Sequence, residues 1–329
     1  MKRIHYALII LFVFLASACK SVKPLGSEGE GKTPPAQEQK TQDFKNTLKK
    51  FPGAMLWQID GFSQTGEPSK VYLLGTYHAG DDRMYPIPEC VQSAIDSSDR
   101  FVCELSKEDW DKMPQLMNDI TMKSFLLDLS HTFVDDLYQE EILLISTFID
   151  QQTLAQLICF EPWVLNNYLQ QVLIMASGLN TQQAYDVFIM DQIAKRNLTF
   201  EGLDKAETQL NLVAYGDWET QLIMLRDTLK DLQNLELSAQ EMEDLYKVFL
   251  AGDEEAFGEA YYKDLKNDLL SHPVYKEYIK ALLDDRNQDW ATKIADYIKQ
   301  GGTTFVFAGC AHFTGPASVF EYMRKNGDL

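Results

Sequence analysis

Two histidines stand at the same spacing from a glycine, each at the end of an apolar run. His78 and His312 each close a Gly-x-x-His motif, which begins at Gly75 and at Gly309. Glu104 follows a third apolar run. Because open α/β sheets bind ligands outside the carboxyl ends of their strands, we expect His78, Glu104 and His312 to converge there. Each glycine is expected to give the chain freedom to turn as it leaves the sheet.

Two imidazoles and one carboxylate are a donor set typical of a catalytic metal site. The set leaves coordination positions open for water, whose pKa a divalent ion lowers toward ~7 while polarising a substrate carbonyl. The trio of His78, Glu104 and His312 therefore predicts a divalent-metal-dependent hydrolase without a serine or cysteine nucleophile. The alternative is that each histidine caps a strand or packs in the core. His5, His131 and His272 do not share the motif.

The surrounding residues predict the elements that position these motifs. Apolar runs bounded by turn residues predict strands at residues 54–59, 70–75, 100–105, 198–203 and 303–308. The first two flank a loop rich in glycine and proline, which indicates a hairpin. Helical spacing of apolar residues runs through two long blocks, residues 107–196 and 205–300. The predicted fold class is α/β: a central β-sheet flanked by helices, with two long helical insertions.

The N-terminus predicts export and a lipid anchor. Lys2 and Arg3 precede an apolar stretch at residues 7–15, and small residues then lead to Cys19. The stretch is shorter than the roughly 20 residues that span a bilayer as a helix, and it is typical of a secretory signal. A cysteine directly after the cleavage site resembles the lipobox of bacterial lipoproteins, in which the thiol is acylated. The alternative is an ordinary signal peptide that leaves Cys19 free.

These signals divide the chain into three parts. We expect a lipoprotein signal peptide at residues 1–18, a flexible tether at residues 19–50 and an α/β domain at residues 51–329. Residues 20–45 are rich in Gly, Pro, Ser, Glu, Lys and Gln, a composition that buries too little apolar surface to fold. The expected location is the bacterial cell envelope, on the extracytoplasmic side, with the membrane bound through lipidated Cys19.

The charge balance excludes a general affinity for nucleic acid. The 329 residues contain 30 Lys and Arg against 49 Asp and Glu, which gives a net charge of −19. A polyanion is repelled by such a surface, and the sequence has no basic stripe. Four cysteines beyond the anchor permit disulfides in an oxidising compartment, but they form no CxxC motif and their pairing stays open. They are Cys90, Cys103, Cys159 and Cys310.

Short motifs occur along the chain at residues 73–78, 102–105, 161–163, 202–209, 286–287 and 308–316. They include Leu-Leu-Gly-Thr-Tyr-His, Glu-Pro-Trp and Ala-Gly-Cys-Ala-His-Phe. In this order they resemble the TraB/GumN family, which is related to the Tiki metalloproteases. The resemblance covers about residues 54–327. It implies an α/β fold and, in the Tiki branch, proteolysis that depends on a divalent ion such as manganese or cobalt, with zinc as another candidate.

By motif position, the resemblance implies that His78, Glu104 and His312 are metal ligands. It also implies that Arg286 and Asn287 form a polar pair near the site and belong, with Glu104, to the candidate catalytic residues. A guanidinium can hold a substrate carboxylate or a developing oxyanion through two hydrogen bonds, and this is the role expected of Arg286.

Three positions depart from the family pattern. Ala311 replaces a glycine, Ser106 replaces an acidic residue, and Asp204 replaces a glutamate that is one methylene longer. Asp204 is therefore a weaker candidate for a catalytic base or for a residue that supports the ligands.

Three functions follow as hypotheses. The first is a membrane-anchored, metal-dependent hydrolase whose substrate is a peptide. The departures from the family pattern motivate the second, a non-catalytic lipoprotein that binds a peptide or small ligand in the same cleft. The third is hydrolysis of a small-molecule ester, because macrolide esterases are distant relatives with similar histidines.

Overall fold

A computed structural model describes residues 45–329, except for the side chains of residues 264 and 267–271. The signal peptide and Cys19 lie outside the described residues, so their assignments stay predictions. Among the described helices, none combines the length and the apolar character that a membrane crossing requires.

The described residues form one six-stranded sheet in the order β1-β2-β3-β6-β4-β5. Its strands are β1 (Thr47–Lys50), β2 (Leu56–Phe62), β3 (Pro68–Thr76), β4 (Arg100–Cys103), β5 (Glu201–Gly202) and β6 (Gly302–Gly309). The first three strands pair antiparallel, whereas β3, β6, β4 and β5 run parallel. The α/β class and the predicted hairpin, which β2 and β3 form, are confirmed.

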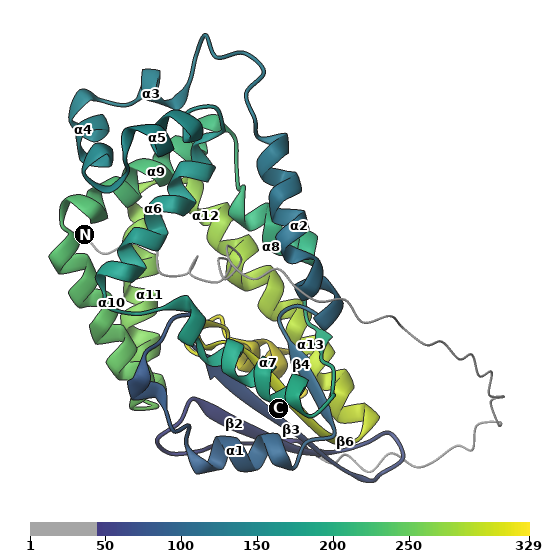
Figure 1. Ribbon diagram of the computed structural model, residues 1–329. Helices are drawn as coiled ribbons and strands as arrows, with labels where there is room; N and C mark the ends of the chain where they lie inside the picture. Colours follow the sequence, from purple (N-terminus) through teal and green to yellow (C-terminus); the bar gives the residue numbers. More distant parts are fainter. Residues whose placement is uncertain (1–44) are drawn as a thin grey trace.

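Helices connect the parallel strands, as parallel pairing requires. These connecting helices are α1 (Glu89–Asp96), α2 (Lys107–Lys123), α3 (Phe133–Asp136), α4 (Gln139–Phe148), α5 (Gln151–Leu157), α6 (Pro162–Ala176), α7 (Tyr185–Lys195), α8 (Ala206–Val213), α9 (Trp218–Gln233), α10 (Leu235–Leu250), α11 (Glu254–Ser271), α12 (Val274–Ile279) and α13 (Asp285–Gln300), and α14 (Val319–Asn326) follows the last strand. The two helical insertions are α2–α7, before β5, and α8–α13, after it. Figure 1 shows the sheet at one end of the molecule and most inserted helices rising from it.

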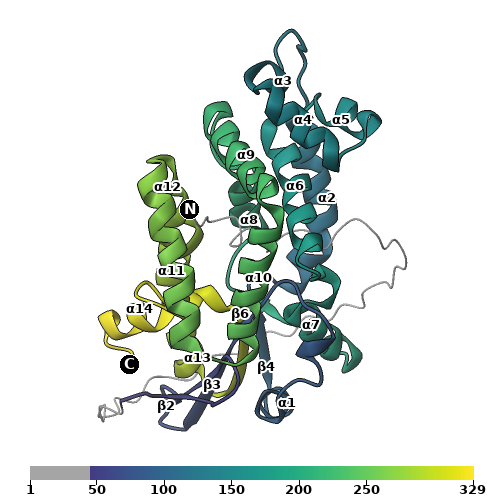
Figure 2. The same cartoon turned by 90° about the vertical axis from the view of Figure 1, so that its left-hand side faces the viewer.

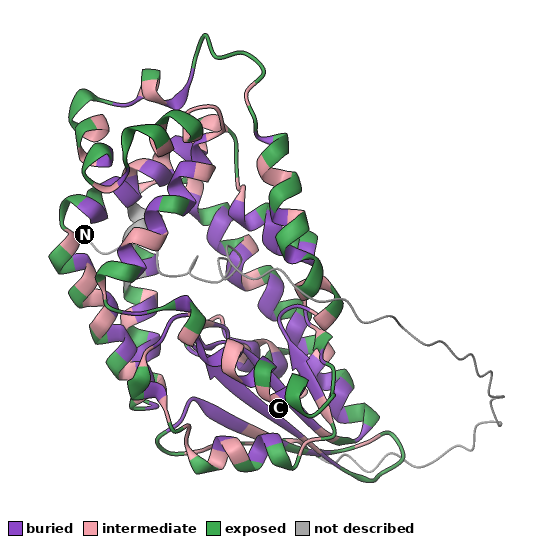
Figure 3. Cartoon of the chain, in the orientation of Figure 1, coloured by how far each residue is buried: buried purple, intermediate pink, exposed green. Residues whose placement is uncertain are grey.

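The central strands are buried on both faces. Every residue from Val71 to Thr76 in β3 and from Thr304 to Gly309 in β6 is buried, which explains why these strands read as continuous apolar runs. Figure 3 shows the same strands in the colour of buried residues. Helices α13 and α14 cover one side of the sheet, and α1 and α7 cover the other (Figure 2).

Strand β1 lies within the range predicted to be tether. Thr47 to Lys50 pair with residues 57–60 of β2, so the sheet begins four residues before Phe51. Half of β1 is exposed and it carries two lysines, as is common for an edge strand. Pairing with β2 holds β1 in the sheet, whereas the sequence of β1 itself carries no strand signal.

Candidate functional site

The proposed ligands leave neighbouring parallel strands at the same edge of the sheet. In the register of β3 and β6, Thr76 lies opposite Gly309, so these strands end together. Strand β4 lies on the other side of β6, with Val102 opposite Val306. His78, His312 and Glu104 each follow one of these ends, so the structure places the three at the same edge of the sheet, and His78 lies beside Glu104.

The glycines of the two Gly-x-x-His motifs permit close packing of the strand ends. A Cβ atom on Gly309 would lie 2.7 Å from His78 Nε2, and one on Gly75 would lie 2.7 Å from Cys310 Cβ. Gly309 has a φ of −50°, which any residue adopts. The glycines are therefore needed for space beside His78 and Cys310, and the expected need for a special backbone turn is not what the structure shows.

Glu104 is buried and fully engaged. Its Oε1 accepts a hydrogen bond from the Gly309 N–H at 2.8 Å, and its Oε2 accepts from Gln209 at 3.1 Å and from Arg286 at 2.7 Å. Burial alone would raise the pKa of this carboxyl. The positive charge of Arg286, together with His78, His312 and the Gly309 hydrogen bond, outweighs it and lowers the pKa to about 2.

This shift predicts a specific loss of stability in acid. The folded-state pKa of about 2 lies below the ordinary value of 4.5, so Glu104 stabilises the fold above pH 4.5 and loses this contribution as the pH falls from 4.5 toward 2. The contribution amounts to about 3 kcal/mol, from ~1.4 kcal/mol for each pKa unit. Urea unfolding at a series of pH values should show a steeper acid decline in the wild type than in Glu104→Gln. Equal declines would contradict the assignment, and Glu259→Gln, at an exposed position of α11, serves as the control.

His78 lies between two carboxylates. Its Nδ1 is 3.3 Å from Asp186 Oδ2, and its Nε2 is 3.7 Å from Glu104 Oε1. Within the described part of the chain, the buried Nε2 has no hydrogen-bond partner. Burial lowers the pKa of His78, but Asp186 and Glu104 together shift it above its ordinary value. The ring therefore presents one nitrogen to Asp186 and holds the other free beside Glu104.

His312 is fixed by Asn287. The Nδ2 amide of Asn287 donates to the carbonyl of Ala317 at 2.7 Å, so its Oδ1 is the atom that faces His312 Nδ1 at 2.6 Å. An amide oxygen only accepts, and Nδ1 must carry the proton. Burial, with the charge of Arg286, shifts the pKa of His312 well below its ordinary value. The neutral ring thus keeps its lone pair on Nε2, and Trp290 packs against it at 4.3 Å between ring centroids.

Arg286 is buried, and protein groups accept hydrogen bonds from each of its three nitrogens. It is 4% exposed and donates from Nη2 to Glu104, from Nε to Asp204 at 2.7 Å and from Nη1 to the Leu282 carbonyl at 3.0 Å. That carbonyl belongs to a π-helical turn, Lys280–Asp284, immediately before α13. These contacts suit a residue that positions Glu104, and the expected role of Arg286 as an anion clamp stays a prediction.

Asp204 belongs to the same buried network. It follows β5, and its backbone N–H donates to the Glu104 carbonyl at 2.7 Å. Its carboxylate accepts from Trp290 Nε1 and from Arg286, both at 2.7 Å. Burial is the largest influence and raises the pKa of Asp204, although Arg286 opposes it. Of the two roles expected for Asp204, the supporting one matches these contacts.

Three residues of the site were missed by reasoning from the sequence. Asp186 contacts His78, Gln209 contacts Glu104, and Trp290 packs on His312. Gln209 stood within a motif of the resemblance but received no role, and Trp290 lies one helical turn after Arg286. Asp186 carries no local signal, because it is one acidic residue in an ordinary amphipathic helix.

The donor atoms suit a divalent metal ion, but His78, Glu104 and His312 are not spaced so that all three could bind one ion. Each histidine has Nδ1 held by an oxygen atom, as is common among metal-ligating histidines. The orphaned, buried Nε2 of His78 is a further match. Among the residues that the structure describes, however, no three or more His, Cys, Asp or Glu side chains are placed so that they could hold an ion.

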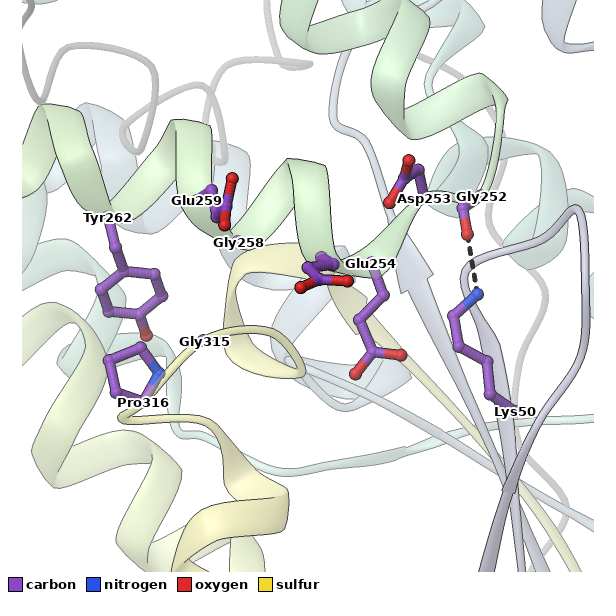
Figure 4. Close-up of a pocket in the computed structure, with 10 residues that line it drawn as sticks. Lys50, Gly252, Asp253, Glu254, Gly258, Glu259, Tyr262, Gly315 and Pro316 are labelled. Carbon is purple, nitrogen blue, oxygen red and sulfur yellow. Dashed lines mark hydrogen bonds between the residues drawn. The ribbon is translucent and has the colours of Figure 1, made fainter.

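His78 and Glu104 line a small hollow, and a larger groove lies elsewhere. The hollow is lined by Thr76, His78, Cys103, Glu104, Leu105, Trp110, Asp186, Gln209, Phe307 and Ala308. A groove of about 700 Å³ runs between the start of α11 and the loop after His312, and Figure 4 shows its acidic side chains. Lys50 closes one end by donating to the Gly252 carbonyl at 2.7 Å. The lining of the groove contains none of the three proposed ligands, whereas that of the hollow contains His78 and Glu104, so we place the candidate site at the small hollow.

The four cysteines of the domain are free thiols in the structure. Cys103 and Cys310 flank the site and are buried, and burial raises the pKa of both thiols well above the ordinary value. A thiolate nucleophile is therefore disfavoured at either position.

Comparisons with known proteins find a family and a relative. The sequence model of the TraB/PrgY/gumN family matches residues 55–328. An uncharacterized protein of Treponema pallidum (strain Nichols) is 26% identical over 276 residues, which cover 82% of this chain and 80% of that protein. No solved structure matches.

Proposed function

The chain belongs to the TraB/PrgY/gumN family, and on this premise we propose that it is a metal-dependent peptidase held at the outer side of a bacterial membrane. The anchor is lipidated Cys19, and the substrate is a peptide outside the cytoplasm. The metal is a divalent ion of the kind that imidazole and carboxylate bind: manganese, cobalt or zinc.

One observation carries the proposal. Two imidazoles stand at the ends of adjacent parallel strands, and each has Nδ1 held by an oxygen atom, which leaves Nε2 as the nitrogen available to a ligand. The free Nε2 of His78 lies 3.7 Å from Glu104 Oε1, close to the ~3.4 Å between two ligands that share one tetrahedral ion at about 2.1 Å. An ordinary core histidine would instead have both ring nitrogens satisfied.

The residues of the chain have distinct roles in this proposal. His78 and His312 would hold the ion through Nε2, and Glu104 would do so through Oε1. A bound divalent ion supplies a Lewis acid and a water of lowered pKa. Arg286, Gln209 and the Gly309 N–H keep Glu104 ionised and fix its orientation. Burial around the trio lowers the local dielectric, which strengthens each of these interactions.

The engagement of Glu104 also supports a second candidate, a lipoprotein that binds a peptide or small ligand without cleaving it. Both carboxylate oxygens already accept hydrogen bonds, and a ligand that only binds needs no further movement of Glu104. Hydrolysis of a small-molecule ester would use the same residues as peptide hydrolysis. Substrate tests therefore have to include peptides and esters side by side.

Turnover separates these candidates. The domain of residues 45–329 is first stripped of metal with a chelator and then reloaded with manganese, cobalt or zinc. We expect it to cleave members of a peptide library, and excess chelator should abolish this cleavage. Cleavage of esters alone would replace peptidase by esterase. Binding of peptides without any turnover, under all three metals, would replace the hydrolase by the non-catalytic binder.

A further inference from the structure

Asp186 reaches the site from the first helical insertion. It lies in the first turn of α7 and is 8% exposed. The segment before α7 is tied to the loop that carries His78: Gly80 and Asn180 exchange two backbone hydrogen bonds of 2.9 Å, and the Tyr185 N–H donates to the Tyr77 carbonyl at 3.2 Å. These bonds hold Asp186 at a fixed place relative to His78.

The close packing of this loop leaves little freedom for either segment. A Cβ atom on Gly80 would lie 2.5 Å from the Gln183 carbonyl oxygen, so the two backbones approach as closely as glycine permits. Tyr85 Oη donates to the same carbonyl at 3.0 Å. The insertion is therefore anchored on both sides of His78, and α7 cannot move away without breaking several backbone contacts.

The surroundings of Asp186 make His78 its main electrostatic partner. Oδ2 lies 3.3 Å from His78 Nδ1, and Oδ1 is buried without a hydrogen-bond partner within the described residues. A buried carboxylate costs several kcal/mol unless it is paired. Since a carboxylate only accepts hydrogen bonds, its contact with a neutral imidazole requires the proton on Nδ1.

His78 and Asp186 both line the small hollow. Thr76 Oγ1, His78 Nε2 and Asp186 Oδ1 are all buried, all lack a hydrogen-bond partner within the described residues, and all belong to residues that line it. With Nδ1 directed to Asp186, Nε2 of the ring faces Glu104. Rotation of the ring by half a turn would move Nδ1 away from its acceptor, Asp186, and would move Nε2 away from Glu104.

We propose that Asp186 is a positioning residue, which fixes the Nδ1–H tautomer and the ring orientation of His78 and so presents Nε2 as a ligand atom to the site. The purpose of this positioning rests on the proposed function, whereas the contact between Asp186 and His78 does not depend on a bound metal. It also makes the site asymmetric, because a carboxylate orients His78 whereas the neutral amide of Asn287 orients His312.

The direct readout is the tautomer of His78 in the metal-free protein. Nitrogen NMR of the ¹⁵N-histidine-labelled domain, at an alkaline pH where imidazole is neutral, distinguishes a protonated from a bare ring nitrogen. The His78 signals are assigned by their loss in His78→Gln. We expect the Nδ1–H form in the wild type and its loss in Asp186→Ala. Asp186→Asn restores an acceptor of the kind that His312 already has, and it should restore the Nδ1–H form.

Metal affinity gives the second readout. Removing a residue that orients a ligand lowers metal affinity by about 10- to 100-fold, and cobalt(II) titration should show this loss in Asp186→Ala and a partial recovery in Asp186→Asn. Asp191→Ala is the matched control, because Asp191 lies on the same helix and pairs at the surface with Lys195. Unchanged His312 signals in each variant exclude a general loss of fold.

The outcomes separate this inference from the proposed function. If His78 keeps the Nδ1–H form in Asp186→Ala, the positioning role is overturned whatever the metal does. If the wild type shows the expected tautomer and its loss in the variant, the role stands, even where cobalt(II) binds none of the proteins and the metal-dependent function fails.

Discussion

Replacement of Arg286 by methionine is expected to destabilise the domain by about 3–5 kcal/mol, the cost typical of removing one partner from a buried ion pair. The guanidinium lies between Glu104 and Asp204, at 2.7 Å from each carboxylate, and the three side chains are nearly inaccessible to solvent. Methionine preserves much of the volume over Trp290, on which the guanidinium now stacks at 4.7 Å. The loss is therefore electrostatic: two carboxylates remain buried without their cation.

Urea unfolding of the wild type, Arg286→Met and Arg324→Met measures this effect. Arg324 pairs with Glu321 at the surface, and an exposed pair contributes only about 0–1 kcal/mol. The triple variant Arg286→Met, Glu104→Gln, Asp204→Asn removes the charges as well as the cation and should recover part of the stability. If Arg286→Met costs no more than Arg324→Met, the buried network does not hold the strand ends in the way described.

The sequence predicted the fold because its signals are local. Strands β3 and β6 are buried on both faces, so they appear as uninterrupted apolar runs, and turn residues mark the hairpin that β2 and β3 form. Edge strands carry weaker signals. Strand β1 is half exposed, and β5 shortens to two residues because only Val102 and Cys103 of β4 pair with it.

The site was predictable only to the extent that topology placed it. A histidine or glutamate at a strand end is visible in the sequence, and the parallel order of β3, β6 and β4 places His78, His312 and Glu104 at one edge of the sheet. Tertiary contacts decide the rest. Arg286 was expected to hold a substrate anion, and nothing in the sequence indicated its bonds to the Leu282 carbonyl and to two carboxylates. Asp186 enters from an insertion whose own pattern predicts only an amphipathic helix.

The second large effect concerns the two histidines, and it follows from their unequal neighbours. His78→Ala removes the nitrogen that faces Glu104 and leaves Asp186 buried without an imidazole, whereas His312→Ala leaves Asn287 without its partner. Each variant should lose metal binding and, with it, metal-dependent turnover. His131→Ala is the matched control, because His131 is exposed and pairs with Asp136 away from the sheet.

Cobalt(II) titration of the chelated domain, followed by visible absorption and by equilibrium dialysis, tests the central claim most directly. The account predicts about one equivalent bound by the wild type and by His131→Ala, with a spectrum that includes nitrogen ligation, and no tight binding by His78→Ala or His312→Ala. Equal binding by all four proteins, or none by the wild type, would contradict a metal site at the ends of β3, β4 and β6.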